Sequence, residues 1–193
     1  MAQTERRLEV AEAAWRVIVR EGLDRTSMRA IAQEMDCTTG VVTHYFRNKQ
    51  ELILFALHQV TERLQELMQQ ASAEQEGCDR LVAMLSSFLP IDQARQEILR
   101  VWVAFLGYAV GREELMADHQ RSAGELRRVI IQELTELQNQ GEIDAAVEPE
   151  QEANVLLALV NGVSLDSLIQ ADSLSCQQQQ VVLQRYVDGL RSR

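Results

Sequence analysis

Residues that break helices are scarce in this chain. Its 193 residues include only two prolines and nine glycines. Proline and glycine are the residues that most disfavour a helix interior, so most of the sequence is free to be helical. Apolar residues make up 46% of the chain and charged residues 25%. These fractions are ordinary for a soluble globular protein, and a chain of this length can bury a substantial core.

Signals for a membrane, for secretion and for disulfide bonds are also missing. No apolar run reaches the roughly 20 residues that a membrane span requires. Arg6 and Arg7 are not followed by an apolar core, so the sequence predicts no signal peptide. The three cysteines, Cys37, Cys78 and Cys176, are far apart and odd in number. We therefore expect reduced thiols in a cytoplasmic protein that does not enter a membrane.

The residue patterns of an enzyme or a metal centre are absent as well. His44, His58 and His119 are scattered and do not have the spacing of a zinc protease. No cysteine pair has zinc-ligand spacing, and there is no glycine-rich phosphate loop. A Ser–His–Asp set is not excluded by the sequence, but nothing points to one. The sequence therefore predicts no catalytic residue, no metal and no cofactor.

The formal net charge of −10 is unevenly distributed. Residues 1–50 contain eight Lys or Arg against seven Asp or Glu, a net charge of +1, whereas the rest of the chain carries −11. An acidic body repels DNA and leaves only the N-terminal part to approach it. Contacts of that part with phosphates should weaken with salt, by about 0.9 log unit of affinity per log unit of salt for each phosphate neutralised.

Residues 26–49 have the pattern of two short helices joined by a tight turn. The first helix is predicted to begin after Ser27, a good N-cap. Its apolar residues recur at helical spacing: Met28, Ile31, Ala32 and Met35. The pattern breaks at Asp36, a residue type able to adopt the left-handed conformation that turns a chain. A second helix is expected from Thr38 or the next residue to about Tyr45.

A third helix is expected to follow Asn48, with Glu51 placed so that its carboxylate can reach back to the N–H of that cap. A short helix, a turn of three or four residues and another short helix form a helix-turn-helix arrangement. The second helix begins with the small or polar residues Thr38, Thr39 and Gly40. Such residues let a helix N-terminus come close to a phosphate or a base edge.

Three groups of residues here resemble the DNA-binding head of the TetR family of repressors. They are Thr26-Ser27-Met28-Arg29-x-Ile31-Ala32, Thr39-Gly40-Val41-Val42-x-His44-Tyr45-Phe46 and Asn48-Lys49-x-x-Leu52. The run Gly-Val-Val-Thr-His-Tyr-Phe is most similar to the choline-sensing BetI-type branch. Asp36 stands where many members have glycine, and Thr43 where many have tyrosine. We therefore expect a slightly different turn and a shorter DNA contact at these positions.

The resemblance implies a set of DNA-binding residues. Those expected at base edges in the major groove are Thr39, Thr43 and His44. Those expected near phosphates are Ser27, Arg29, Thr38, Gly40, Tyr45 and Lys49. Val41 or Val42 could touch a thymine methyl group. A place in the core is the stronger expectation for Val42 and Phe46, and both roles remain open for Tyr45.

Periodicity along the whole chain predicts an all-α fold of about nine helices. The longer helices are expected at 4–21, 48–70, 78–89, 93–110, 112–140, 149–170 and 173–190. In the first, Trp15 is expected in the core, and Ser175 with Gln178 predicts a capping box for the last. We expect a helix-turn-helix DNA-binding domain over residues 1–48, with its motif at about 27–46. An effector-binding and dimerisation domain would cover residues 49–193.

The last two helices carry more apolar surface than a terminal hairpin needs. These residues are Leu156, Leu159, Val160, Val163 and Leu168 on one helix, and Val181, Val182, Leu183, Tyr186, Val187 and Leu190 on the other. Gly162 and Ser164 would allow another helix to approach closely. We expect a two-fold four-helix interface of a homodimer, which a palindromic operator also requires. The alternative is that these helices only cover the core of a monomer.

TetR-like proteins enclose a small molecule among the helices that follow the head. The effector-binding candidates in this sequence are Trp102, Phe105, Tyr108, Asn161 and Asp166. Aromatic rings together with a carboxylate suit a quaternary ammonium or another cation. The alternative is that aromatic residues three apart on an apolar helix belong to the core.

These patterns together predict a ligand-responsive, sequence-specific DNA-binding regulator. The resemblance implies a repressor that a small-molecule effector releases from double-stranded DNA. An enzyme is disfavoured by the missing catalytic patterns. A purely structural helical interaction protein is the remaining alternative.

Overall fold

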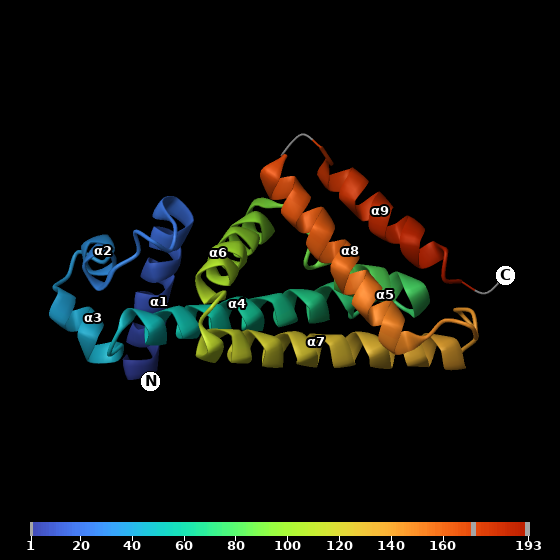
Figure 1. Ribbon diagram of the computed structural model, residues 1–193, viewed down its shortest axis with the longest axis horizontal. Helices are drawn as coiled ribbons and strands as arrows, with labels where there is room; N and C mark the ends of the chain where they lie inside the picture. Colours follow the sequence, from blue (N-terminus) through green and yellow to red (C-terminus); the bar gives the residue numbers. More distant parts are fainter. Residues whose placement is uncertain (1, 171–172, 192–193) are drawn as a thin grey trace. The chain divides into compact units, whose positions relative to one another are not determined.

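The computed structural model describes residues 2–170 and 173–191, with side chains from residue 5. Over these residues the chain folds into nine α-helices (Figure 1). They are α1 (Ala2–Glu21), α2 (Met28–Glu34), α3 (Thr39–Tyr45), α4 (Lys49–Ser72), α5 (Gly77–Ser86), α6 (Gln93–Ala109), α7 (Glu113–Asn139), α8 (Pro149–Ile169) and α9 (Cys176–Asp188). The all-α fold expected from the sequence is confirmed. The last helix begins at Cys176 rather than at residue 173, because Ser175 forms the predicted capping box with Gln178.

The helices form two compact units. The head unit contains the residues up to Glu62 together with Arg100–Ala117, and the body unit contains Arg63–Leu99 and Asp118–Arg193. Helices α4, α6 and α7 therefore each contribute residues to both units. The compact head unit extends past residue 48, and a division of function at that residue stays a prediction.

Helices α1, α2 and α3 pack together in the head unit around a small apolar core. Its fully or almost fully buried residues are Val10, Ala13, Ala14, Val17, Ile31, Ala32, Val42, Phe46 and Leu52. The expectation for Trp15 was wrong, because this residue is only half-buried. The centre of the α1 face is formed instead by the small residues Ala13 and Ala14, which let α2 and α3 approach more closely than an indole would.

The core of the body unit is formed by α5, α7, α8 and α9. Its most deeply buried residues are Leu81, Leu85, Leu134, Ala153, Leu156 and Val187. The end of the chain is tied to the α7–α8 loop, because the N–H of Asp144 donates to the carbonyl of Leu190 at 2.9 Å. Arg191 then pairs with Asp79 at the start of α5, at 2.9 Å. These contacts make Leu190 and Arg191 part of the body.

Candidate DNA interface

The turn between α2 and α3 has the conformation that the sequence predicts. Ser27 caps α2, since its hydroxyl oxygen accepts a hydrogen bond from the N–H of Ala30 at 3.1 Å. Asp36 adopts a φ of +50°, the left-handed region, and the N–H of Cys37 then donates to the carbonyl of Ala32 at 2.9 Å. An aspartate tolerates this region better than most side chains, so the turn does not need the glycine that many related heads carry.

Helix α3 has one buried face and one exposed face. Val42 and Phe46 are fully buried, which confirms their place in the core. The exposed residues are Thr38, Thr39, Gly40, Thr43 and His44. They include the residue before the helix and the first two residues within it, so the free N–H groups of the helix N-terminus lie among them. This exposed face has the donors and small side chains that a phosphate or a base edge requires.

The hydroxyl groups on this face differ in what they can offer to DNA. Thr38 is the N-cap residue of α3, but its side chain makes no capping hydrogen bond. The Thr43 hydroxyl donates to the carbonyls of Thr39 and Gly40, at 3.1 and 3.2 Å, and retains acceptor capacity. His44 lies edge-on to the half-buried Tyr45, with ring centroids 4.9 Å apart. Ser27, the N-cap of α2, and Arg29, in the first turn of that helix, are exposed.

Lys49 differs from the other predicted contacts because its amine already has partners in the head unit. The Nζ atom donates to the carbonyl oxygen of Leu23 at 2.6 Å and lies 5.4 Å from the centre of the Tyr108 ring. Burial lowers the pKa of this amine, with the charge of Asp24 acting in the opposite direction. Leu23 takes only one of the three donors of this ammonium group, so the others could still reach a phosphate, and this contact stays a prediction.

Most other cations of the head also have partners. Arg16 and Arg20 share the carboxylate of Glu34, each at 2.8 Å, and the pKa of that carboxyl is lowered mainly by the hydrogen bonds from Arg16 and Arg20.

The predicted capping interaction of Glu51 was wrong by one residue. Its carboxylate accepts from the N–H of Arg47, at 2.9 Å, rather than from the N–H of Asn48.

Arg7 holds the end of α3 against α4. Its guanidinium carbon lies 4.9 Å from the ring centre of Phe46 and 4.7 Å from that of Phe55. One terminal nitrogen also lies 3.3 Å from a carboxylate oxygen of Glu51. No pattern in the sequence indicates this role of Arg7, because Phe46, Glu51 and Phe55 lie almost 40 residues or more away along the chain.

Three exposed arginines within or beside the helix-turn-helix motif remain for DNA. Within the part of the chain that the structure describes, Arg25, Arg29 and Arg47 form no ion pair. Only Arg29 was among the predicted contacts. Arg25 and Arg47 flank the helix-turn-helix motif in sequence, and this position beside the predicted phosphate contacts Ser27 and Tyr45 is the signal from which both could have been predicted.

The five effector-binding candidates are divided between the two compact units. Trp102, Phe105 and Tyr108 belong to the head unit, and Asn161 and Asp166 belong to the body unit. Phe105 is fully buried, whereas Trp102 and Tyr108 are half-buried. The Tyr108 ring is covered by the guanidinium of its neighbour on the chain, Arg112, at 3.9 Å.

Asn161 and Asp166 are both exposed on α8. Asp166 accepts a hydrogen bond from the hydroxyl of Ser173 at 2.8 Å. The structure therefore shows one ring that already binds cations of the chain itself, and two polar side chains open to solvent. Their joint role in holding an effector stays a prediction.

Comparisons with known proteins decide the family. Residues 10–55 match the family described as bacterial regulatory proteins of the tetR family, and residues 78–192 match the BetI-type transcriptional repressor C-terminal domain. The chain belongs to the TetR family. It is a DNA-binding transcriptional repressor with a BetI-type C-terminal domain of the kind that binds small-molecule ligands.

Individual TetR-family relatives match over nearly the whole chain. The regulator PksA of Bacillus subtilis is 26% identical over 190 residues, which cover 96% of this chain and 89% of PksA. The regulator BetI of Escherichia coli is 26% identical over 180 residues, which cover 89% of this chain and 87% of BetI. These relatives are transcriptional regulators, in agreement with the expectation that the chain is not an enzyme.

A solved structure shows the same fold. It is a regulator from Saccharomonospora viridis in complex with choline, with a TM-score of 0.91 and 19% sequence identity, covering 98% of this chain and all of that one. At this identity the likeness establishes the arrangement of the helices. It does not identify a ligand of the present TetR-family chain.

Proposed function

We propose that this TetR-family repressor acts in the cytoplasm as a homodimer on a palindromic operator, and that a small cationic effector releases it. The observation that carries the DNA-binding part is the exposed face of α3, where small and hydroxyl-bearing residues surround a free helix N-terminus. The residues proposed to bind DNA are Ser27, Arg29, Thr38, Thr39, Gly40, Thr43, His44, Tyr45 and Lys49. Arg25 and Arg47 join them, because both are exposed and form no ion pair with the described residues.

An exposed apolar stripe on α8 supports the homodimer. Val155, Leu165 and Ile169 are 44%, 43% and 70% exposed, although each is a large apolar residue. They lie on one face of the helix with Gly162, where an added Cβ would meet no atom within 4 Å. An apolar stripe with a glycine at its centre is suited to close packing against the same helix of a second copy.

Two features of α8 refine this proposal. Ser164 was expected at the interface, but it is buried and its hydroxyl donates to the carbonyl of Phe88 at 3.1 Å. Its role is therefore within the core of the body. By length and composition α8 could also cross a membrane. A helix covered on one face by the body core and on the other by a second copy would have the same composition, and we favour this explanation.

The cationic effector is supported by chemistry and by relatives. The body is strongly acidic, so it attracts cations. Proteins similar to this chain include BetI regulators and a regulator whose structure contains choline. Trp102 and Phe105 of the head unit, and Asn161 and Asp166 of the body unit, are each proposed as effector-binding candidates. At Tyr108 a cationic effector would have to replace the guanidinium of Arg112.

Release would follow from a shift between two shapes of the dimer. A symmetric operator requires two recognition helices about 34 Å apart. An effector that prefers a different spacing lowers operator affinity in proportion to its preference. A coupling of about 1–3 kcal/mol corresponds to roughly 5–150-fold in affinity, which is sufficient for regulation.

Selection of bound sequences from a random DNA pool tests the proposal. We expect an inverted repeat to be enriched, and choline to reduce binding to that repeat in a gel-shift titration. Enrichment of a single half-site without symmetry would contradict the dimeric operator. An unchanged affinity with choline and with polyamines would contradict the cationic effector but not the palindrome, so the two parts fail separately.

A further inference from the structure

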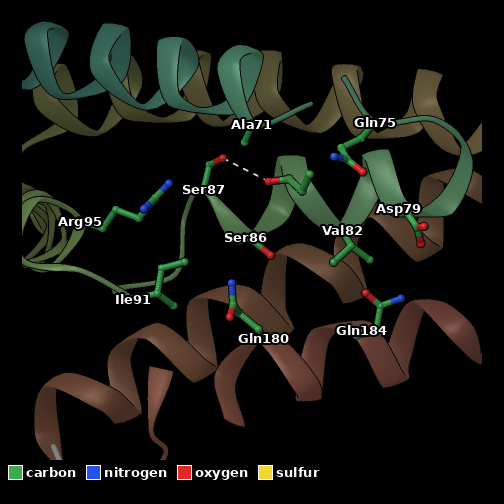
Figure 2. A pocket seen from close by; sticks show the side chains of 11 residues that line it. Ala71, Gln75, Asp79, Val82, Ser86, Ser87, Ile91, Arg95, Gln180 and Gln184 are labelled. Atoms are coloured by element: carbon green, nitrogen blue, oxygen red, sulfur yellow. Dashed lines mark hydrogen bonds between the residues drawn. The ribbon is translucent and has the colours of Figure 1, made fainter. Parts of the chain in front are cut away.

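A groove in the body unit has a lining of its own. It has a volume of about 640 Å³ and lies over α5, with the end of α4 on one side and α9 on the other (Figure 2). Its lining residues are Ala71, Gln75, Asp79, Val82, Ala83, Ser86, Ser87, Ile91, Arg95, Gln180 and Gln184. None of the five predicted effector residues is among them. A volume of this size is typical of small-molecule sites.

The two ends of the groove carry opposite charges. Figure 2 shows Arg95 at one end and Asp79 at the other. The Arg95 side chain is only 19% exposed, and one terminal nitrogen pairs with Asp92. Its Nε atom is buried and, within the described residues, has no hydrogen-bond partner. The guanidinium lines the groove and has five donors, of which Asp92 takes only part, so it can still donate to an acceptor that enters the groove.

At the opposite end the Asp79 carboxylate is accessible, with 66% of its side chain exposed. It accepts one hydrogen bond from Arg191, at 2.9 Å, and retains further acceptor capacity for a second cation. The groove residues themselves therefore present one positive and one negative group. A ligand with a complementary negative and positive group would be neutral overall, and so would avoid the repulsion that the acidic body exerts on anions.

Between the charged ends the groove presents carboxamides above an apolar floor. Gln75 comes from the segment after α4, and Gln180 and Gln184 come from α9 (Figure 2). Half-buried Val82 and Ile91 form part of the floor. A carboxamide has the same donor and acceptor groups as a peptide bond, so it can pair with the backbone of an extended peptide.

The groove is long enough to hold a short peptide. Its lining along α5 from Asp79 to Ser86, without Arg95 on α6, already measures about 10 Å at a rise of 1.5 Å per residue. An extended tripeptide also spans about 10 Å and would lie along this stretch, with Arg95 beyond the Ser86 end (Figure 2). We propose that the groove is a second ligand site, for a short zwitterionic peptide whose carboxylate binds Arg95 and whose ammonium group binds Asp79.

Calorimetric titration of the full chain with trialanine tests this proposal, and two modified peptides isolate the charges. Trialanine amide lacks the carboxylate, and N-acetyl-trialanine lacks the ammonium group. We expect saturable binding of trialanine and binding at least about tenfold weaker for either modified peptide, since a hydrogen bond to a charged group has that effect. Equal binding of all three peptides, or no saturable binding of trialanine, would overturn the proposal.

Variants locate the site. Arg95→Gln is expected to weaken trialanine binding at least about tenfold, whereas Arg100→Gln, the same change at an exposed position of α6, should leave it unchanged. Gln180→Ala, at an exposed position of α9, should also weaken binding and gives a second test if Arg95→Gln does not fold. Unchanged binding in Gln180→Ala and in folded Arg95→Gln would overturn the site. None of these measurements involves DNA or choline, so their outcome is independent of the proposed repressor mechanism.

Discussion

The carboxylate of Glu142, in the loop after α7, accepts a hydrogen bond from the N–H of Cys78 in the first turn of α5, at 3.0 Å. The interaction places a negative charge at a helix N-terminus, where it is favourable. It depends on Gly77, whose φ is +57° and whose added Cβ would clash with the Glu142 carboxylate, so that this side chain would have to move away from the N–H of Cys78. The hydrogen bond that joins the α7–α8 loop to α5 therefore requires a glycine at position 77.

Replacement of Gly77 by alanine is expected to destabilise the protein by about 1–3 kcal/mol, because it strains the backbone and displaces the capping carboxylate. Chemical denaturation measures this change. Gly124→Ala is the matched control, since an added Cβ there meets no atom within 4 Å and helical glycine lacks that strain. A fall in stability for Gly124→Ala as large as that for Gly77→Ala would contradict the explanation.

Replacement of Gly40 by alanine separates stability from DNA binding. An added Cβ would lie 3.6 Å from the Thr38 hydroxyl, an ordinary contact, so the fold has no need of glycine here. We expect unchanged or slightly higher stability, by up to about 1 kcal/mol, because alanine favours helix. Operator affinity should fall if DNA approaches this backbone closely. Wild-type affinity in Gly40→Ala would remove Gly40 from the proposed contacts.

Lys49 and Arg47 should behave differently when each is replaced by alanine. Arg47 is exposed and unpaired within the described part of the chain, so Arg47→Ala should reduce the salt dependence of operator binding without a loss of stability. Lys49→Ala should lower stability by about 1–2 kcal/mol through loss of the hydrogen bond to Leu23, and should also weaken operator binding.

Operator titrations at several salt concentrations, with thermal melts of each variant, distinguish these effects. Thr43→Ala completes the set as an uncharged change on the same exposed surface. If Lys49→Ala and Thr43→Ala both keep the wild-type affinity and salt slope, their assignment as DNA contacts is wrong.

The proposed homodimer face predicts a contrast between two valines. Val155 on α8 and Val129 on α7 are similarly exposed, at 44% and 40%. We expect Val155→Glu to convert the protein to a monomer in sedimentation, because the charge would be buried against the second copy. Val129→Glu should leave the dimer intact. A wild-type protein that sediments as a monomer at micromolar concentration would exclude the interface altogether.

The ion pairs of Glu34 predict how the head responds to acid. Arg16 and Arg20 lower the pKa of this carboxyl, so its charged form stabilises the folded state. This contribution is complete above the unfolded pKa of a glutamate, about 4.3, and is lost as the pH falls through the lower folded pKa. Glu34→Gln should therefore melt at a lower temperature than the wild type at pH 7, and the difference should shrink below about pH 4. The exposed Glu12→Gln variant should show no such difference at either pH.

Local signals allowed much of the head to be predicted from sequence. The Ser27 cap, the left-handed Asp36 and the buried Val42 and Phe46 all depend on neighbours within a few residues. Other predictions were wrong because they depend on tertiary contacts. The apolar stripe through Trp15 overlaps the one through Ala13 on the same helix, and only the close approach of α2 and α3 decides which is central.

The site could be predicted in part for the same reason. The exposure of Thr38, Thr39 and Gly40 follows from the motif. Two other contacts join distant residues. The Lys49 amine donates to the carbonyl of Leu23, 26 residues away, and the Ser164 hydroxyl donates to the carbonyl of Phe88, 76 residues away. Patterns in a single sequence hold no record of such pairings, because each requires the helices to be assembled first.

The shared carboxylate of Glu34 also affects how this repressor would search a genome. Its single negative charge offsets part of the charge of Arg16 and Arg20 and holds both side chains in ion pairs, so these two cations are less available to DNA. Non-specific binding to DNA depends on such cations, whereas specific binding to the operator depends on contacts with base edges. Fewer molecules would then be held on competing chromosomal DNA, so a small number of copies per cell would be enough to keep a single promoter occupied.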